Sequence, residues 1–221
     1  MIRTLMLLVL GFLLFSAESI SAHKSPSFLG SYKITYYYLA QEKSGGNWPL
    51  YSAQCRKLIR RTSKEFYLEL SREGSGKLRD GRIINFEERC DCAKPGFQGG
   101  RICYSLLESA RFPWGRGALM GKDFFPLQPF QSVAVDTSRV PLGSWLYLPK
   151  LKGVVAPNGE ILNGCVRAGD TGKLVQGRHL DLFSGTYEWS EKLRKTLKAK
   201  RVQVYNGVGR CDRGKAAANG N

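Results

Sequence analysis

Acidic residues are scarce in this sequence, and nucleic-acid recognition motifs are absent from it. The 221 residues include 18 Asp and Glu against 34 Lys and Arg, which gives a formal net charge of +16 at pH 7. A field of this sign favours polyanionic partners. The chain has neither a zinc-finger spacing nor an aromatic RNA-binding strand, so nucleic acid is not an expected partner. Two interpretations of the charge stay open: attraction to anionic polymers of a cell envelope, or a basic surface that serves solubility alone.

Long apolar runs are also absent, with one exception at the N-terminus. Arg3 precedes an apolar run from Leu5 to Phe15, and small residues follow as far as Ala22. This order predicts a secretory signal peptide over residues 1–22, cleaved near Ala22. The run is too short to span a bilayer comfortably, and no later segment is apolar enough to do so. We therefore expect a soluble exported protein, either periplasmic or secreted from the cell.

The cysteines lack the companions that a zinc site needs. The motif Cys90-x-Cys92 is joined by no second Cys-x-x-Cys motif and by no paired histidines, so a metal site there is the weaker interpretation. An even number of cysteines in an exported chain predicts disulfides, whose pairing the sequence leaves open. We expect neither a metal nor a cofactor. All the cysteines lie beyond the predicted cleavage site: Cys55, Cys90, Cys92, Cys103, Cys165 and Cys211.

The first half of the mature chain combines one strand with a long insertion. Residues 28–40 are rich in aromatic and β-branched types, which are typical of strands. The alternation at 65–70 indicates a half-buried strand or hairpin, and the glycines and prolines at 111–130 predict an irregular connection. We interpret residues 41–127 as an elaboration of one domain, not as an independent domain.

The second half consists of short apolar segments separated by turns. Residues 188–200 have helical spacing, because Trp189, Leu193 and Leu197 fall four apart on one face. Short strands with turn signals and one late helix predict a small β-barrel in a single domain over 23–208, followed by a tail at 209–221. There is no internal repeat. The expected strands are 132–135, 145–148, 151–155, 161–166, 179–183 and 202–205.

Three aspartates stand beside or inside these strands and form the candidate site. They are Asp136, Asp170 and Asp181. Carboxyls at strand ends on a rigid barrel can be partly desolvated, so that burial and mutual repulsion keep one of them protonated near neutral pH. A protonated acid is what the cleavage of a glycosidic bond requires. The ordinary alternative is that each aspartate hydrogen-bonds nearby backbone amides in a turn.

Two blocks around these aspartates resemble one family of domains. The segment 132–136, followed by Val140-Pro141-Leu142-Gly143, is similar to the VAVDxxxIPLG block of the three-aspartate (3D) domain. Residues 170–185 resemble its DTGxxIxGxxxDxFxG block, and Ile34-Thr35-Tyr36-Tyr37 resembles its first strand. All three aspartates fall at the positions that the family's pattern gives them.

The resemblance covers residues 130–206 well, 28–40 fairly and 41–127 hardly. The 3D domain is the catalytic core of the membrane-bound lytic transglycosylase A family and of smaller secreted relatives. The resemblance implies a mainly β fold: a six-stranded double-psi β-barrel with a long insertion after the first strand and one C-terminal helix.

The same resemblance implies a peptidoglycan lytic transglycosylase that cleaves the MurNAc–GlcNAc β-1,4 bond and forms 1,6-anhydroMurNAc. Asp181 matches the family's catalytic acid/base, and Asp170 and Asp136 match the aspartates that support it. The expected partners are peptidoglycan glycan strands and, as a second class, other anionic envelope polymers. The residues assigned to substrate binding stand within or beside the matched blocks: Thr35, Tyr36, Thr171, Gly172, Gly177 and Arg178.

This sequence departs from the family's pattern at two places. Lys173-Leu174 replaces the usual small pair after Asp-Thr-Gly, so the rim of the groove is expected to differ. His179 lies two residues before Asp181 and could tune its pKa, although a lone histidine on a strand is more often packed or at the surface.

Three other functions are weighed against this one. A glycan hydrolase would use two aspartates on the same barrel, one of them to activate water. A non-catalytic, expansin-like wall-binding module would stack sugars on Trp48, Trp114, Trp145 or Trp189, although core packing explains most tryptophans. An aspartic protease needs two facing Asp-Thr-Gly motifs, and this chain has one.

Overall fold

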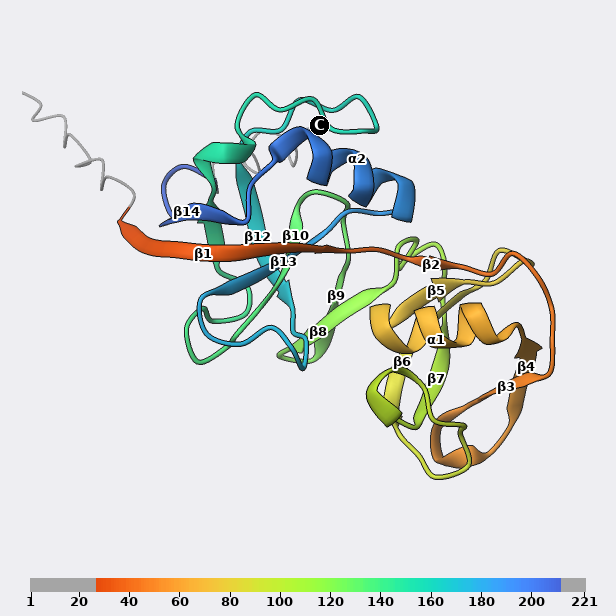
Figure 1. Ribbon diagram of the computed structural model, residues 1–221. Helices are drawn as coiled ribbons and strands as arrows, with labels where there is room; N and C mark the ends of the chain where they lie inside the picture. Colours follow the sequence, from red (N-terminus) through yellow and green to blue (C-terminus); the bar gives the residue numbers. More distant parts are fainter. Residues whose placement is uncertain (1–26, 212–221) are drawn as a thin grey trace, which may run out of the picture.

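The computed structural model describes residues 27–211, which form two lobes joined side by side (Figure 1). The predicted signal peptide and the end of the tail lie outside these residues. One lobe contains the first strand and the C-terminal part of the chain, and the other contains most of the insertion. Strand β1 runs along the first lobe, and the chain continues from it into the second. No helix within 27–211 has the length and apolar character that crossing a membrane requires.

The first lobe is built on six strands that hydrogen-bond in the closed order β1-β13-β10-β12-β11-β14. Strand β13 pairs parallel with β1 and antiparallel with β10, which pairs parallel with β12. Apolar side chains from all six strands fill the interior, among them Ile34, Val133, Leu146, Val166, Leu180 and Val204. The mainly β fold is confirmed, whereas the double-psi connectivity stays a prediction. The strands are β1 (Phe28–Tyr37), β10 (Ser132–Val135), β11 (Trp145–Tyr147), β12 (Cys165–Asp170), β13 (His179–Phe183) and β14 (Arg201–Asn206).

Helix α2 (Tyr187–Leu197) covers the barrel and agrees with the predicted helix, although it ends three residues earlier. The Thr186 side chain caps its N-terminus by accepting a hydrogen bond from the Trp189 amide, 3.2 Å away. Leu193 and Leu197 are buried against the barrel core. Lys198 then adopts a left-handed conformation, with φ 47°, which ends the helix.

The second lobe has a hydrophobic core of its own, which includes Leu50, Tyr67, Leu70, Ile84 and Tyr104. A four-stranded sheet in the order β2-β5-β6-β7 and a β3-β4 hairpin surround helix α1. Two 3₁₀ turns, η1 (Ala53–Cys55) and η2 (Phe97–Gly99), lie in its loops. The other elements are β2 (Ala40–Gln41), β3 (Trp48–Tyr51), β4 (Leu58–Thr62), α1 (Lys64–Glu73), β5 (Ser75–Lys77), β6 (Ile83–Arg89) and β7 (Ile102–Leu107).

The expectation of a strand or hairpin at 65–70 is wrong, because these residues lie in helix α1. The Ser63 side chain accepts a hydrogen bond from the Phe66 amide, and Gly74 ends the helix with φ 82°. Phe66 and Leu70, four residues apart, are both buried on the inner face of the helix. The apolar residues therefore follow a helical period that six residues are too few to distinguish from alternation.

Two expectations for the connections also need correction. Residues 111–130 are not irregular throughout, because β8 (Arg116–Met120) and β9 (Asp123–Pro126) form a hairpin there. The expected strand at 151–155 is replaced by the 3₁₀ turn η3 (Pro149–Leu151) and a single bridge between Val155 and Ile161. The strand expected at 161–166 begins only at Cys165 and continues to Asp170.

All six cysteines form disulfides, which confirms the prediction and leaves no thiol for a metal. Cys55–Cys92 and Cys90–Cys103 cross-link the second lobe, and Cys165–Cys211 ties β12 to the end of the described chain. The alternative of a metal site at Cys90 and Cys92 is therefore wrong in this oxidised form.

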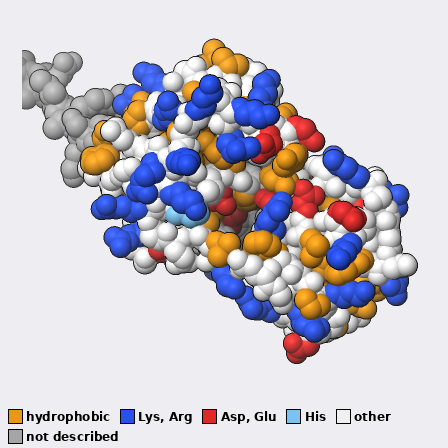
Figure 2. Space-filling view, viewed as in Figure 1, with side chains coloured by type: hydrophobic (Ala, Val, Ile, Leu, Met, Phe, Trp, Pro, Cys, Tyr) orange, Lys and Arg blue, Asp and Glu red, His pale blue; other side chains and the backbone are white. Residues whose placement is uncertain are grey.

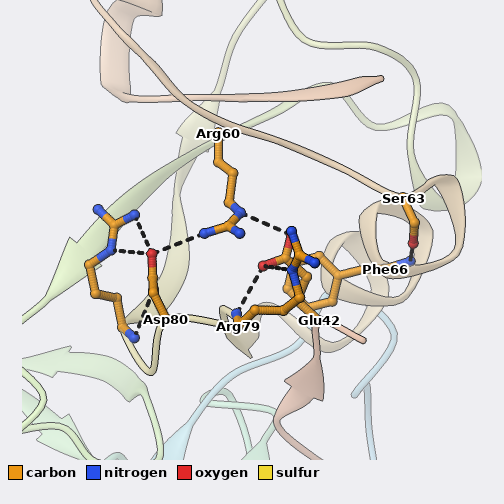
Figure 3. Close-up of polar contacts among 7 residues, drawn as sticks. Glu42, Arg60, Ser63, Phe66, Arg79 and Asp80 are labelled. Carbon is orange, nitrogen blue, oxygen red and sulfur yellow. Dashed lines mark hydrogen bonds and ion pairs between the residues drawn. The ribbon is translucent and has the colours of Figure 1, made fainter. Parts of the chain in front are cut away.

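A buried carboxylate organises one edge of the second lobe (Figure 3). The Glu42 side chain is fully buried, and its Oε1 lies 3.1 Å from Nε of Arg60. The Arg79 amide donates to Glu42 Oε2 at 2.9 Å, and Arg60 also contacts Asp80 at 2.9 Å. This network connects the segment after β2 with β4 and with the turn before β6, and so fixes this edge of the second lobe.

Candidate active site

The strand register places two of the three predicted aspartates on either side of one small residue. In β10, Ala134 pairs with Asp181 of β13 on one side and with Asp170 of β12 on the other. Thr35 of β1 pairs with Asp181 from the far side. Residues in such a row point to the same face of a sheet, and neighbouring strands lie about 4.8 Å apart. Ala134 itself is 3% exposed and lies in an apolar cluster with Tyr37 and Phe183, so the two carboxyls flank a packed residue.

Asp181 is half-buried and has one hydroxyl partner. The Thr35 Oγ1 lies 2.6 Å from Asp181 Oδ1 and donates to it when the carboxyl is ionised. Burial raises the pKa of Asp181. A hydrogen bond donated by Thr35 lowers it, as do the charge of Lys33 and a charge on His179 when that imidazole is protonated. The balance is a raised pKa, so Asp181 is suited to hold a proton as a general acid.

Asp170 is also half-buried, but two donors point at it. The Tyr37 hydroxyl donates to Asp170 Oδ2 at 2.8 Å, and the Thr171 amide donates to Oδ1 at 2.8 Å. Burial raises the pKa of Asp170 to about 7; the two donors work against this rise, and the charge of Asp181 adds to it. Both Asp170 oxygens thus accept hydrogen bonds in the ionised form. The two donors therefore favour the ionised form of Asp170, whereas its burial favours the protonated form.

The third aspartate, Asp136, makes its contacts elsewhere. Its carboxylate accepts from the Ser138 hydroxyl at 2.7 Å, the Ser138 amide at 2.9 Å and the Gly177 amide at 2.6 Å. These hydrogen bonds hold the pKa of Asp136 below its usual range. Gly177 has φ 64°, a left-handed conformation that favours glycine. Asp136 therefore fixes the loop before β13, a positioning role that differs from direct participation in the reaction.

Comparison with known proteins gives one match to a family model. Residues 131–205 match the family model of the 3D domain. The chain contains a 3D domain. A search of curated proteins gave no match.

Several solved structures share the fold. E. coli MltA with bound chitohexaose aligns with a TM-score of 0.55 and 16% identity, over 80% of this chain and 71% of that chain. A membrane-bound lytic murein transglycosylase from Agrobacterium tumefaciens aligns with a TM-score of 0.53 and 14% identity, over 86% of this chain and 76% of that chain. MltA from Neisseria gonorrhoeae aligns with a TM-score of 0.52 and 13% identity, over 79% of this chain and 72% of that chain. The aligned share exceeds residues 131–205, so the shared fold extends beyond the 3D domain.

The residues predicted to bind substrate differ in where their side chains lie. Thr35 lies at the centre of the site, and the Thr171 amide binds Asp170. Gly172 and Gly177 belong to the loop that Asp136 fixes. Tyr36 points to the opposite face of β1 and packs against the barrel core, so the prediction for its side chain loses its geometric basis. The Arg178 side chain lies over Gly30, five residues before Thr35 on β1, and so extends away from the aspartates.

Two residues of the site were missed by the sequence analysis. Tyr37 shares the face of Thr35, and the two-residue period of a strand is a signal that could have identified it. Glu73, the last residue of α1, comes from the second lobe, where the resemblance gave no guide. Its oxygens accept from the Tyr38 amide at 3.2 Å and from Nε of Arg72 at 2.7 Å. Burial raises the pKa of Glu73 to about 7, and the charge of Asp181 contributes to this rise.

The surface between the two lobes is hollowed, with acidic side chains in the hollow and Lys and Arg on the surrounding surface (Figure 2). The β8–β9 hairpin contacts both lobes: the Arg116 amide donates to Asn85 of β6, and Phe125 packs beside Gly169 of β12. The aspartates therefore lie beside the junction of the two lobes, and Glu73 approaches them from the second lobe.

Proposed function

We propose that this protein is a peptidoglycan lytic transglycosylase with Asp181 as its general acid and base. The observation that carries the proposal is the paired environment of the two carboxyls. Asp181 has a raised pKa and a hydroxyl partner that can accept as well as donate, whereas Asp170 has two dedicated donors. These partners favour a proton on Asp181 and a charge on Asp170, and a protonated acid beside an ionised one is the requirement for cleaving a glycosidic bond with acid assistance.

In the proposed reaction, Asp181 gives its proton to the oxygen of the MurNAc–GlcNAc β-1,4 bond as the carbon–oxygen bond breaks. The ionised Asp170 stabilises the positive charge that develops on the sugar ring. The C6 hydroxyl of the MurNAc residue attacks its own anomeric carbon and forms the 1,6-anhydro ring. Asp181, now a carboxylate, takes the hydroxyl proton and returns to its starting state, so the step consumes no water.

Several features support this proposal besides the carboxyls. The 3D domain and the shared fold support a peptidoglycan-degrading role, and one protein of that fold was solved with chitohexaose bound. The basic surface around the acidic hollow suits a polymer whose peptide stems carry carboxylates. We also propose that the barrel has the double-psi connectivity and that the protein is exported to the cell envelope, as its N-terminal sequence predicts.

Hydrolysis on the same barrel is the second candidate. Asp170 and Asp181 both pair with Ala134 in the sheet, and a hydrolase could use such a pair of carboxyls, one of them to activate water. The wall-binding alternative has less support, because Trp114 and Trp189 pack against each other, with ring centroids 5.6 Å apart, and against Phe183 and Phe130. Those two rings serve packing and are not free platforms for sugars.

The experiment is a digest of purified peptidoglycan analysed by the mass of the released muropeptides. Wild-type protein is expected to release fragments with 1,6-anhydroMurNAc ends, and Asp181→Asn none, because the amide has no acidic proton. Asp123→Asn is the matched control, since Asp123 lies on the hairpin with its side chain 76% exposed, paired with Arg111. Full activity of Asp181→Asn would contradict the assignment. Fragments with hydrolysed ends would select the second candidate.

A further inference from the structure

Three side chains form a continuous hydrogen-bond chain that ends at Asp181. His179 Nδ1 lies 3.1 Å from the carbonyl oxygen of Leu174, and His179 Nε2 lies 2.8 Å from Thr35 Oγ1. Thr35 Oγ1 in turn lies 2.6 Å from Asp181 Oδ1. Strand geometry explains the alignment, because His179 and Asp181 are two residues apart on β13 and share a face. His179 is only 9% exposed, so water cannot readily replace these partners.

The direction of each hydrogen bond follows from the number of hydrogens available. The Leu174 carbonyl can only accept, so His179 Nδ1 must carry a hydrogen. In a neutral ring, Nε2 then has none and accepts the hydrogen of the Thr35 hydroxyl. Thr35 has no second hydrogen to give, so its oxygen can only accept from Asp181. Every group in the chain is then satisfied, on the condition that Asp181 is protonated.

Ionised Asp181 breaks this pattern. Thr35 would have to donate either to the carboxylate or to His179 Nε2, and the other acceptor would lose its hydrogen. The only way to satisfy both acceptors is to place a second proton on the imidazole. The chain therefore holds one proton in one of two arrangements: on Asp181 beside a neutral His179, or on His179 beside an ionised Asp181.

We propose that His179 is a positioning residue that acts through Thr35: as a neutral imidazole with its hydrogen on Nδ1, it draws the Thr35 hydroxyl away from Asp181 and so favours the protonated carboxyl. The consequence for catalysis rests on the proposed function. The direction of the hydrogen bonds does not, because it is a property of the free protein.

The direction in which removal of His179 shifts the pKa of Asp181 shows whether His179 is neutral or charged. Lys33 on β1 is basic, whereas Asp170 on β12 and Glu73 on α1 are acidic and interact electrostatically with Asp181. A charged His179 would add to Lys33 and lower the pKa of Asp181. A neutral His179 that accepts from Thr35 has the opposite effect. Removing the imidazole therefore moves the titration of Asp181 in opposite directions in the two cases.

The first test is nitrogen NMR of the imidazole groups near neutral pH, using the whole exported protein. The full sequence contains only two histidines, His23 and His179, so assignment needs one variant. His179 is expected to be neutral, with hydrogen on Nδ1 and none on Nε2. Asp181→Asn should leave this tautomer unchanged, because the amide N–H can donate to Thr35 as the acid does. Hydrogen on both nitrogens of His179 in the wild-type protein would overturn the proposal.

The second test is the pH dependence of kcat/KM on soluble glycan fragments. In His179→Phe, Thr35 donates freely to the carboxylate, so the alkaline limb should move to lower pH by about one unit, the effect of one hydrogen bond. His179→Gln should keep the wild-type limb, since its amide can donate to Leu174 and accept from Thr35. An unmoved or upward-shifted limb in His179→Phe overturns the proposal.

Two further outcomes are separable. If His179→Phe does not fold, as judged by circular dichroism, Thr35→Val takes its place in the pH profile, because it removes the hydroxyl through which His179 acts. Thr35→Ser keeps a hydroxyl and should have the wild-type alkaline limb. If the wild-type protein releases no glycan fragments, the proposed function fails, while the tautomer of His179 still decides this inference.

Discussion

Replacing Tyr37 by phenylalanine should lower the activity at neutral pH, because more of Asp170 becomes protonated. The Tyr37 hydroxyl is buried, and it donates to Asp170 Oδ2 at 2.8 Å. A hydrogen bond to a charged group contributes about 1.5–3 kcal/mol, and one pKa unit corresponds to about 1.4 kcal/mol. The substitution should therefore raise the pKa of Asp170 from about 7 by roughly one to two units.

At pH 7 the ionised fraction of Asp170 would fall from about one half to about one to ten per cent. Because the ionised form stabilises the developing charge, kcat/KM at pH 7 should fall about fivefold to fiftyfold, and the acid limb of its pH profile should move upward. Glycan-fragment release measured between acidic and alkaline pH checks both. Tyr36→Phe is the matched control, because the Tyr36 hydroxyl on the opposite face has no hydrogen-bond partner. An unmoved acid limb in Tyr37→Phe, or an equal loss in Tyr36→Phe, would refute the reasoning.

Three further predictions concern stability and binding. Burial raises the pKa of Asp170 to about 7 in the folded protein, so its ionisation lowers the free energy of unfolding as the pH rises from about 4 to 7. In urea unfolding, Asp170→Asn should therefore be about 2–4 kcal/mol more stable than wild type above pH 7 and equally stable below pH 4. Glu42→Ala should destabilise the protein by about 2–4 kcal/mol in the same assay, because it removes a buried carboxylate from two arginines, while Glu87→Ala at a half-exposed position should cost less. Binding of Asp181→Asn to intact peptidoglycan should weaken steeply in pull-down assays as salt is added, because the net charge is +16, and salt-insensitive binding would contradict an electrostatic contribution.

The sequence predicted the barrel strands best where short apolar runs are buried on both faces. Ser132–Val135 and His179–Phe183 were predicted with their observed bounds, because most of their residues are apolar and buried. Helix α1 was missed because its polar outer face leaves only short apolar pieces. Cys165–Asp170 was displaced, because a strand that carries Arg167 and Asp170 lacks a continuous apolar run.

For the site, sequence reasoning identified the three aspartates but not the different role of each. Asp136, Asp170 and Asp181 have similar settings in the sequence, and only the hydrogen-bond partners separate the loop-fixing Asp136 from the other two. Glu73 could not be found, because its approach to Asp181 depends on how the second lobe packs against the barrel. His179 was recognised as a neighbour of Asp181, but its connection through Thr35 depends on the pairing of β1 with β13.

The central claim is that the sugar's own C6 hydroxyl, not water, attacks the anomeric carbon after Asp181 has protonated the bond. Digestion of peptidoglycan in heavy-oxygen water, followed by mass analysis of the new ends, tests this claim directly. We predict that the new MurNAc ends carry no oxygen from the solvent and are lighter than hydrolysed ends by one water. Incorporation of solvent oxygen into every new end would contradict the account and show that the carboxyl pair activates water.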